Sequence, residues 1–252
     1  MSSSQYTLYE LVAHADDRES QSTHSFFVLR TKLDLALLGL KYTRVPLAFG
    51  DIEGTLGAGV TLPTLATGTG RVVDSFSIAE YLEGQHATGG KYLFGPGGSR
   101  LARFIQSWAD GALLPAMMPL LAPLFVAHND AASRAYFVTR IWPADEVERM
   151  SAELRDAERV RENAAAVRKV LRVLEVYLAH SSGRFILGDT PTHADSIVGG
   201  YYFASQVNPA LNALVWDHAE LPRVARWVKD FKEASGFEVA YPPPPAGVVA
   251  DV

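Results

Sequence analysis

Cysteine is absent from the 252 residues of this chain. Its absence excludes disulfide bonds, thiolate metal sites and a cysteine nucleophile, and it is typical of proteins from a reducing compartment. Any thiol chemistry therefore needs a thiol that a ligand supplies.

Excess positive charge and long apolar runs are also lacking. The chain has 23 Lys and Arg residues against 28 Asp and Glu residues, a formal net charge of −5, without a dense basic run. This balance disfavours nucleic acid or an anionic membrane as a partner and favours a small molecule. The first residues do not resemble a signal peptide, and no segment has the roughly 18 uninterrupted apolar residues of a membrane span. We expect a cytoplasmic protein.

The first 86 residues alternate strand-like and helix-like segments. Alternating or β-branched runs indicate strands, and apolar residues at helical spacing indicate helices. The predicted order is β-α-β-α-β-β-α, an α+β domain with a four-stranded mixed sheet. The predicted strands are 6–12, 42–47, 61–66 and 72–74, and the predicted helices are 25–40 and 75–82. The segment 51–59 is predicted to be a short helix or an irregular connection.

The second part of the chain has a different pattern. Glycines and a proline over 89–98 indicate a linker, so we expect one domain over 1–88 and an all-α domain over 99–240. The proline-rich tail over 241–252 is predicted to be extended along the surface. The predicted helices of this part are 99–126, 130–141, 145–180, 192–206 and 220–234.

Two dipeptides in the first domain indicate a binding site. Leu62-Pro63 lies in a strand-like stretch, where a proline without an N–H is confined to a sheet edge or a cis bond. Asp74-Ser75 stands where a strand meets a helix, which is a favourable position for an N-cap and for binding a charged group. Each dipeptide alone has an ordinary structural explanation.

Together, the segments TLPTL and VVDSFSIAEYLE behind a β-α-β unit resemble the N-terminal domain of cytosolic glutathione transferases. The resemblance implies a thioredoxin-like domain, glutathione as co-substrate and a homodimer. It implies that the backbone of Leu62, before a cis Pro63, pairs with the cysteinyl part of glutathione. It also implies that Asp74 and Ser75 bind the γ-glutamyl end, although glutamate is commoner than aspartate in the family at the first of these positions.

The resemblance extends to the helical part. Thr192 and Asp195 have the N-cap to N3 spacing of a capping box, after a Phe-Ile-Leu-Gly segment at 185–188. The same arrangement occurs in the helical domain of the family. We expect it to stabilise the fold and to have no catalytic role.

Ser25 is the candidate that activates the thiol. The segment that begins at Ser25 resembles the S-P-x-x-W-[RK]-T-[RK] pattern of fungal etherase-like members, with Phe26 and Leu29 in place of Pro and Trp. A serine at a helix N-terminus can donate its O–H to a thiolate. A plain N-cap serine is the alternative role. His24 has no evident orienting residue, and exposed loop histidines are common, so it is not assigned as a base. Other candidates for activation are Ser20, Ser22, Thr23, Tyr6 and Tyr9.

The segment 113–125 indicates an apolar pocket, because it combines three prolines and two methionines in a helical stretch. A buried, kinked core helix is the alternative interpretation. No metal site is predicted, since His14 with Asp16 and Asp17 forms no ligand spacing. Arg18 and Arg30 are candidates to reach the glycyl carboxylate of glutathione, but we expect both to be solvated surface residues. Candidates for the apolar pocket are Trp108, Met117, Met118, Phe125 and Tyr201, with Tyr202, Tyr136, Phe137 and Trp142 as further lining.

The sequence therefore predicts a glutathione transferase in which Ser25 stabilises a thiolate that attacks an apolar or aromatic electrophile, with ether cleavage as one form of the reaction. Two alternatives stay open, a non-catalytic carrier of hydrophobic ligands and a glutathione-dependent peroxidase. Reduction by an active-site cysteine is disfavoured because the chain has none.

Overall fold

The computed structural model describes residues 5–16, 18–88, 90–95 and 98–250. Its sheet has four strands in the order β2-β1-β3-β4, in which β1 is parallel to β2 and antiparallel to β3, and β3 is antiparallel to β4. The predicted α+β order of the first domain is confirmed. The strands are β1 (Tyr6–Leu11), β2 (Tyr42–Leu47), β3 (Thr64–Thr67) and β4 (Gly70–Val73).

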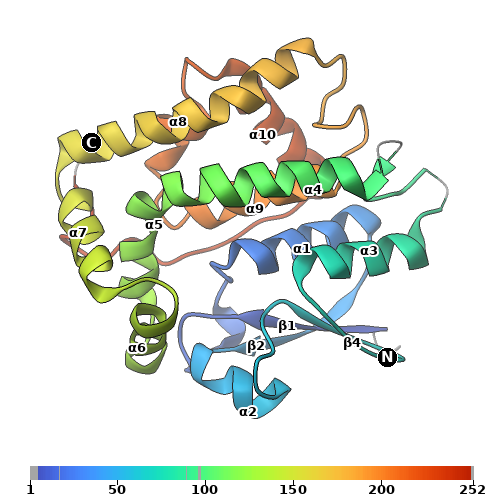
Figure 1. Ribbon diagram of the computed structural model, residues 1–252, viewed down its shortest axis with the longest axis horizontal. Helices are drawn as coiled ribbons and strands as arrows, with labels where there is room; N and C mark the ends of the chain where they lie inside the picture. The colour runs from blue at the N-terminus through green and yellow to red at the C-terminus, as the bar shows by residue number, and fades with distance from the viewer. Residues whose placement is uncertain (1–4, 17, 89, 96–97, 251–252) are drawn as a thin grey trace.

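Three helices accompany the sheet. Helices α1 (Phe26–Leu38) and α3 (Ser75–His86) lie between the sheet and the helical part of the chain, and the short α2 (Ile52–Leu56) lies on the opposite side (Figure 1). The strand predicted over 61–66 begins only at Thr64, because Leu62 and Pro63 have no ladder partner. Both residues therefore lie in the loop that leads into β3.

The rest of the chain is helical, as predicted, with one correction. The helix predicted over 145–180 is two helices, because Asp156 accepts hydrogen bonds from the N–H groups of Glu158 and Arg159 and starts a new helix there. Residues 89, 96 and 97 of the predicted linker lie outside the described residues. The helices are α4 (Gly98–Trp108), α5 (Leu114–His128), α6 (Ala131–Arg140), α7 (Ala144–Leu154), α8 (Ala157–His180), α9 (His193–Ser205) and α10 (Pro222–Ser235).

Helices α4 and α5 are joined by a π-helical segment, Ala109–Leu113, where the chain turns downward in Figure 1. Pro115 follows in the first turn of α5. Among the described residues, the continuous helix Gly98–His128 is the one that is long and apolar enough to cross a membrane by length and composition. Half of its apolar window is buried inside the protein, which is also typical of a core helix.

Helix α9 forms the centre of the molecule and packs directly on α1. A Cβ at Gly200 would lie 2.7 Å from the backbone oxygen of Phe26, so glycine permits the close approach of the two helices. Nδ1 of His193 lies 2.7 Å from Oδ2 of Asp34, and both side chains are buried. The sheet domain and the helical part therefore share one continuous core.

The start of α9 is fixed by the buried carboxylate of Asp195. Its Oδ2 accepts hydrogen bonds from the N–H and hydroxyl of Thr192, at 2.8 and 3.0 Å. Its Oδ1 accepts from the N–H of Ile186 and the indole of Trp227, at 2.9 and 2.8 Å. Burial raises the pKa of this carboxyl, although these hydrogen bonds oppose the rise. The carboxylate of Asp195 therefore joins the start of α9 to α10 and to the segment that precedes α9.

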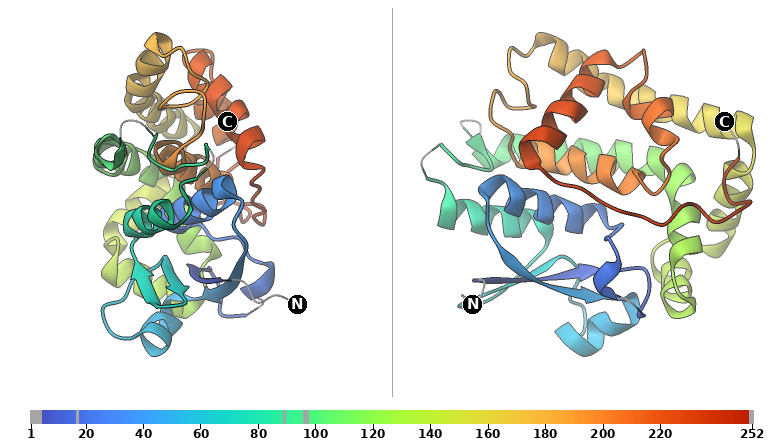
Figure 2. Two further views of the ribbon diagram at one scale, coloured as in Figure 1. Left: turned by 90° about the vertical axis from the view of Figure 1, so that its right-hand side faces the viewer. Right: turned by 180° about the vertical axis from the view of Figure 1, so that it is seen from behind.

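The segment after α10 is extended, as predicted. It runs along the back of the molecule from α10 past the start of α1 to α7 (Figure 2). Val248 and Val249 pack against the core, and the N–H of Ala250 donates to the backbone oxygen of Leu154 at 2.9 Å. This segment therefore covers the point where the two parts of the chain meet.

Candidate functional site

A cleft of about 480 Å³ lies between the sheet domain and the helical part. One wall comes from the start of α1, the loop before β3 and the start of α3, and the other comes from α5 and α6. Five of the predicted glutathione-site residues line it together: Ser25, Leu62, Pro63, Asp74 and Ser75.

Ser25 is the N-cap residue of α1. Its Oγ accepts a hydrogen bond from the N–H of Val28 at 3.4 Å, and its own N–H donates to Oγ1 of Thr23 at 3.2 Å. Among the described residues, its hydroxyl hydrogen has no acceptor. Ser25 can therefore donate to a group in the cleft while it caps the helix, and the positive end of the helix points to the same place.

The loop before Ser25 is held on two sides. On the sheet side, Arg44 donates to the backbone oxygens of Glu19 and Gln21 and pairs with the buried carboxylate of Glu10. On the other side, the C-terminal segment contacts the loop through Tyr241, whose hydroxyl donates to the backbone oxygen of Thr23. These contacts fix the position of Ser25.

The peptide bond between Leu62 and Pro63 is cis. Within the described part of the chain, the N–H and C=O of Leu62 form no hydrogen bond, and Leu62 lines the cleft. A pair of free backbone groups at the end of a strand can receive an extended peptide-like ligand by forming a short ladder with it. The backbone of Leu62 is therefore free to pair with a ligand in the cleft, which is the role that the sequence predicts for it.

Asp74 and Ser75 lie at the start of α3. Asp74 has a positive φ of 81°, and its Oδ1 accepts from the N–H groups of Phe76 and Ser77 at 3.1 and 3.0 Å. Its other carboxylate oxygen has no partner among the described residues. Ser75 is 1% exposed, and its Oγ is buried without a hydrogen-bond partner. Two consecutive residues at one edge of the cleft therefore carry unpaired polar groups, a carboxylate oxygen in Asp74 and a hydroxyl in Ser75.

The other wall of the cleft is apolar. Met118 and Phe125, both predicted, line it from α5, and Tyr136 from α6 stacks on Phe49 with ring centroids 4.8 Å apart. Sequence reasoning missed Arg140, whose guanidinium has no ion-pair partner among the described residues. A single arginine in a helical pattern gives no signal that could have found it. The remaining lining on this side comes from Phe137 and Trp142, both predicted, and from Leu114 and Ile141.

Trp108, Met117 and Tyr201 are not among the residues that line this cleft. Met117 is 1% exposed within the core. The hydroxyl of Tyr201 donates to Oδ1 of Asp110 at 2.7 Å, beside the guanidinium of Arg30. Tyr202 is also buried and packs on Trp216. These positions contribute to the packing of α4, α5 and α9.

Arg30 corrects another expectation. It was expected to be solvated, but its side chain is fully buried and pairs with Asp110 at 2.5 Å. Burial by itself would raise the pKa of Asp110, and the hydrogen bond and charge of Arg30 lower it below its usual value. Arg18 pairs with Asp51 at 3.0 Å. Neither arginine is among the residues that line the cleft.

The other hydroxyl groups considered for activation lie elsewhere. Tyr6 hydrogen-bonds with Nε2 of His86 at 2.7 Å, and burial, followed by the effect of Tyr81, raises its pKa to about 12. Tyr9 packs under Arg71. Neither tyrosine lines the cleft, and neither do Ser22 and Thr23. The side chain of Ser20 lies outside the described residues.

His24 is buried, where an exposed loop residue was expected. It is 6% exposed, its Nε2 has no partner in the part of the chain that the structure describes, and its ring stacks on Phe125 with centroids 4.8 Å apart. Burial, followed by the charge effect of His128, lowers its pKa to about 4. Without an orienting partner, His24 forms a wall of the cleft and is poorly suited to act as a base. Within the described residues, which leave out Asp17, no group of three or more His, Asp or Glu residues is arranged to hold a metal ion.

Comparison with known proteins gives a consistent result. Residues 101–233, more than half of the chain, match the family described as "Glutathione S-transferase, C-terminal domain". No relative is found among curated protein sequences.

Three solved structures illustrate the similarity in fold. A glutathione transferase of Phanerochaete chrysosporium is 19% identical with a TM-score of 0.75, covering 95% of this chain and 100% of its own. A glutathione S-transferase of Ceriporiopsis subvermispora, solved in complex with glutathione, is 17% identical with a TM-score of 0.73, covering 91% of this chain and 97% of its own. A maleylacetoacetate isomerase of Anaeromyxobacter dehalogenans, solved with bound glutathione, is 20% identical with a TM-score of 0.54, covering 93% of this chain and 96% of its own.

Proposed function

Because the chain belongs to the glutathione S-transferase family, we propose that it binds glutathione in this cleft and joins it through its sulfur to an apolar or aromatic electrophile. One observation carries the proposal. One cleft brings together the donor hydroxyl at the start of α1, the free backbone N–H and C=O of Leu62, and the unpaired carboxylate oxygen of Asp74 beside the buried hydroxyl of Ser75. The opposite wall of this cleft is apolar. We also propose two domains, over 1–88 and 99–240, and a cytoplasmic location.

The proposed arrangement of glutathione follows from the unpaired groups. The N–H and C=O of Leu62 would pair with the backbone of the cysteinyl residue. The free carboxylate oxygen of Asp74 suits the ammonium of the γ-glutamyl end, and the hydroxyl of Ser75 suits its carboxylate, because charge-assisted hydrogen bonds are stronger than neutral ones. Binding would give the buried Oγ of Ser75 the partner that it lacks.

The proposed chemistry begins with ionisation of the thiol. A free thiol has a pKa of about 8.5, so only a few per cent is thiolate at neutral pH. The thiol proton passes to solvent, the O–H of Ser25 donates a hydrogen bond to the resulting thiolate sulfur, and the positive end of α1 adds to the stabilisation of the negative charge. The thiolate then attacks the electrophilic carbon, a C–S bond forms, and the leaving group departs with the bonding electrons. For an aryl ether the leaving group is a phenolate, which takes a proton from solvent.

The apolar wall supports an aromatic electrophile. Met118, Phe125 and Trp142 offer an adaptable surface for a flat ring, since methionine packs well against aromatic groups. Arg140 lies at the same wall and offers a positive charge to a departing phenolate or to an acidic substituent of the substrate.

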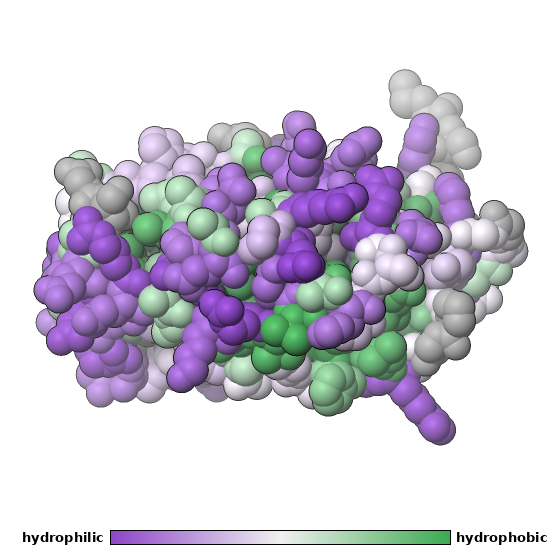
Figure 3. All heavy atoms as spheres, turned by 90° about the horizontal axis from the view of Figure 1, so that it is seen from above, coloured by the Kyte–Doolittle hydropathy of each residue, from purple (hydrophilic) through white to green (hydrophobic). Residues whose placement is uncertain are grey.

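A homodimer is the proposed assembly. Figure 3 shows a mostly hydrophilic face on which hydrophobic residues gather toward the lower edge. Phe104 on α4 is 67% exposed, and Leu101 lines a shallow pocket together with Tyr177 of α8. Val173 and Val176 lie on the same exposed face of α8 as Tyr177. An exposed apolar group of this kind on a soluble fold is typical of a protein interface.

The proposal is tested by screening the purified protein with glutathione and with aryl halides, unsaturated carbonyls and aryl ethers, while calorimetry measures glutathione binding. We expect binding and turnover of at least one aromatic electrophile. Binding of glutathione and hydrophobic ligands without any turnover would favour the carrier alternative, and turnover of hydroperoxides alone would favour the peroxidase. Absence of glutathione binding would contradict the site itself.

A further inference from the structure

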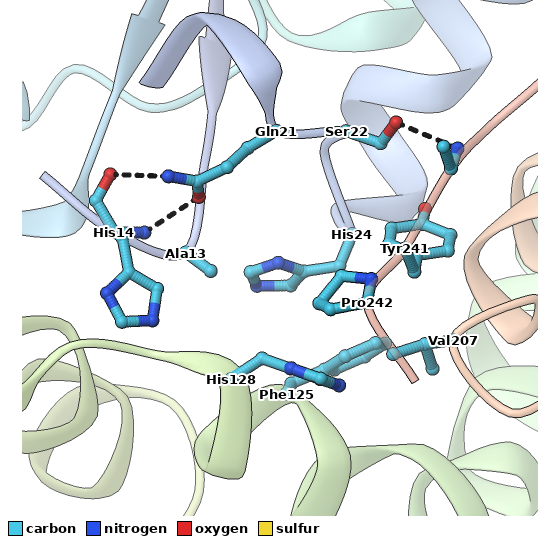
Figure 4. A pocket seen from close by; sticks show the side chains of 11 residues that line it. Ala13, His14, Gln21, Ser22, His24, Phe125, His128, Val207, Tyr241 and Pro242 are labelled. Atoms are coloured by element: carbon cyan, nitrogen blue, oxygen red, sulfur yellow. Dashed lines mark hydrogen bonds between the residues drawn. The ribbon is translucent and has the colours of Figure 1, made fainter. Parts of the chain in front are cut away.

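A second cavity, of about 400 Å³, lies behind the cleft. His24 and Phe125 line both spaces and separate them. The rest of the second cavity comes from the loop after β1, the end of α5, Val207 just after α9 and the C-terminal segment (Figure 4). Its size is within the range of small-molecule pockets, which is about 300–1,000 Å³.

The cavity contains unused hydrogen-bonding capacity. Among the described residues, the buried Nε2 atoms of His24 and His128 have no hydrogen-bond partner, and such buried nitrogens are nearly always paired in folded proteins. Figure 4 shows the imidazole rings of His14, His24 and His128 around one space. The Oγ of Ser22 accepts from the N–H of Ala240 at 3.1 Å, so its hydroxyl hydrogen is still available to a ligand.

The cavity is also nearly free of charge. Within the described part of the chain, no carboxylate, ammonium or guanidinium lines it. Burial lowers the pKa of His24 to about 4 and also lowers the pKa of His128, with smaller effects from His128 on His24 and from His14 on His128. Both imidazoles are therefore neutral at neutral pH, and each has one N–H donor and one acceptor nitrogen. A charged carboxylate would find no ammonium or guanidinium group among these lining residues.

One wall of the cavity is flat and aromatic. The rings of His24 and Phe125 stack with centroids 4.8 Å apart and planes at 28°. A planar ring can extend this stack, and ring contacts add to the stabilisation from burial alone. A hydroxyl on that ring would lie among the imidazole nitrogens.

We propose that this cavity is a second binding site, which takes a small uncharged phenol. The ring of the ligand packs at the wall formed by His24 and Phe125. Its hydroxyl donates to an acceptor nitrogen of the histidine group and accepts from a donor such as Ser22. The site is separate from the glutathione cleft, and it stands whether or not the chain is a transferase.

Three probes of nearly the same shape test the chemical class. Binding of 2-naphthol, naphthalene and 2-naphthoate is measured by calorimetry on the full chain with glutathione present in excess. We expect 2-naphthol to bind at least tenfold more tightly than the other two, because only it is both uncharged and able to donate a hydrogen bond. Equal affinity for all three, tighter binding of the naphthoate, or no binding of 2-naphthol would overturn the proposal.

Variants locate the site. His128→Leu keeps apolar volume and removes the imidazole, so the affinity for 2-naphthol should fall about tenfold, the equivalent of one hydrogen bond. Tyr136→Ala, at the apolar wall of the cleft, is the matched control and should leave it unchanged. The reverse pattern would place 2-naphthol in the cleft and overturn the proposal.

Since His128→Leu can fail to fold, nuclear magnetic resonance of the unmodified protein provides a second measurement. The ring signals of His14 and His128 should shift with 2-naphthol, and the absence of any shift would contradict the site.

Discussion

The hydroxyl of Tyr241 donates a hydrogen bond to the backbone oxygen of Thr23 across an O–O distance of 2.6 Å. The two residues are 218 positions apart in the sequence, and Thr23 in turn accepts, through its Oγ1, the N–H of Ser25. A neighbouring contact joins the N–H of Ala240 to the Oγ of Ser22. The last segment of the chain therefore fixes the loop that places Ser25 in the cleft.

The variant Tyr241→Phe tests this tether. It removes one hydrogen bond and leaves the backbone oxygen of Thr23 unpaired, so the free energy of unfolding should fall by about 1 kcal/mol. If the tether positions Ser25, kcat should fall several-fold while the Kd of glutathione stays the same. Chemical unfolding and steady-state kinetics measure the two effects. Tyr177→Phe, which removes an exposed tyrosine hydroxyl on α8, is the control. Equal kinetics for both variants would show that the tether has no role in catalysis.

The variant Asp74→Asn separates the charge of this residue from its structural role. Asparagine is as good an N-cap as aspartate and also tolerates a positive φ, so the stability of α3 should change by less than about 0.5 kcal/mol. The Kd of glutathione should rise about tenfold, because the ammonium of the ligand loses its charged partner.

The matched control for Asp74 is Asp156→Asn. Asp156 caps α8 through the same pattern of two backbone N–H groups, and it lies outside the cleft. Calorimetry should give an unchanged Kd for this control. A normal Kd in Asp74→Asn would remove Asp74 from the glutathione site.

The features of the fold and of the site that could be predicted are those that depend on residues close together in the sequence. The order of strands and helices follows from periodicity within short windows, and it was predicted correctly. The capping serine, the cis-proline loop and the start of α3 are also local patterns. The break at Asp156 was missed because the charged and apolar periodicity continues across it. The burial of Arg30 was missed because its partner Asp110 is 80 positions away. The tether from Tyr241 depends on an even longer separation, which no local pattern indicates.

The burial of His24 predicts a pH dependence of stability. Its pKa is lowered to about 4 in the folded chain from an ordinary value of 6.5, by burial first and by His128 second. As the pH falls, the unfolded chain therefore takes up the proton first. The contribution of neutral His24 to the free energy of unfolding is therefore complete above pH 6.5 and is lost as the pH falls toward about 4. The total loss in the free energy of unfolding is about 3 kcal/mol.

Unfolding free energies of the parent and of His24→Phe, measured across this interval, isolate the contribution. The phenylalanine keeps a ring against Phe125 and removes the titration, so the variant should lose less stability on acidification. His180→Phe, at an exposed position at the end of α8, should follow the parent. Parallel curves for the parent and His24→Phe would contradict a neutral, buried His24.

The exposed apolar group on α4 and α8 predicts where the dimer forms. Phe104→Glu places a charge at the most exposed of these side chains, so the variant should be monomeric at concentrations where the parent is dimeric. Light scattering after size-exclusion chromatography measures the mass. Ile141→Glu alters an exposed apolar residue at the cleft instead and should remain dimeric. A monomeric parent, or a dimeric Phe104→Glu, would argue against this interface.

The most direct test of the central claim is the pKa of the glutathione thiol when it is bound, followed by the ultraviolet absorbance of the thiolate in the parent and in Ser25→Ala. The account predicts a value well below the usual value of about 8.5 in the parent and a return toward it in the variant, with glutathione still bound. Because the variant also loses an N-cap, its melting curve is recorded to show that it is folded at the titration temperature. An unchanged thiol pKa in folded, glutathione-bound Ser25→Ala would contradict the assignment of thiol activation to Ser25.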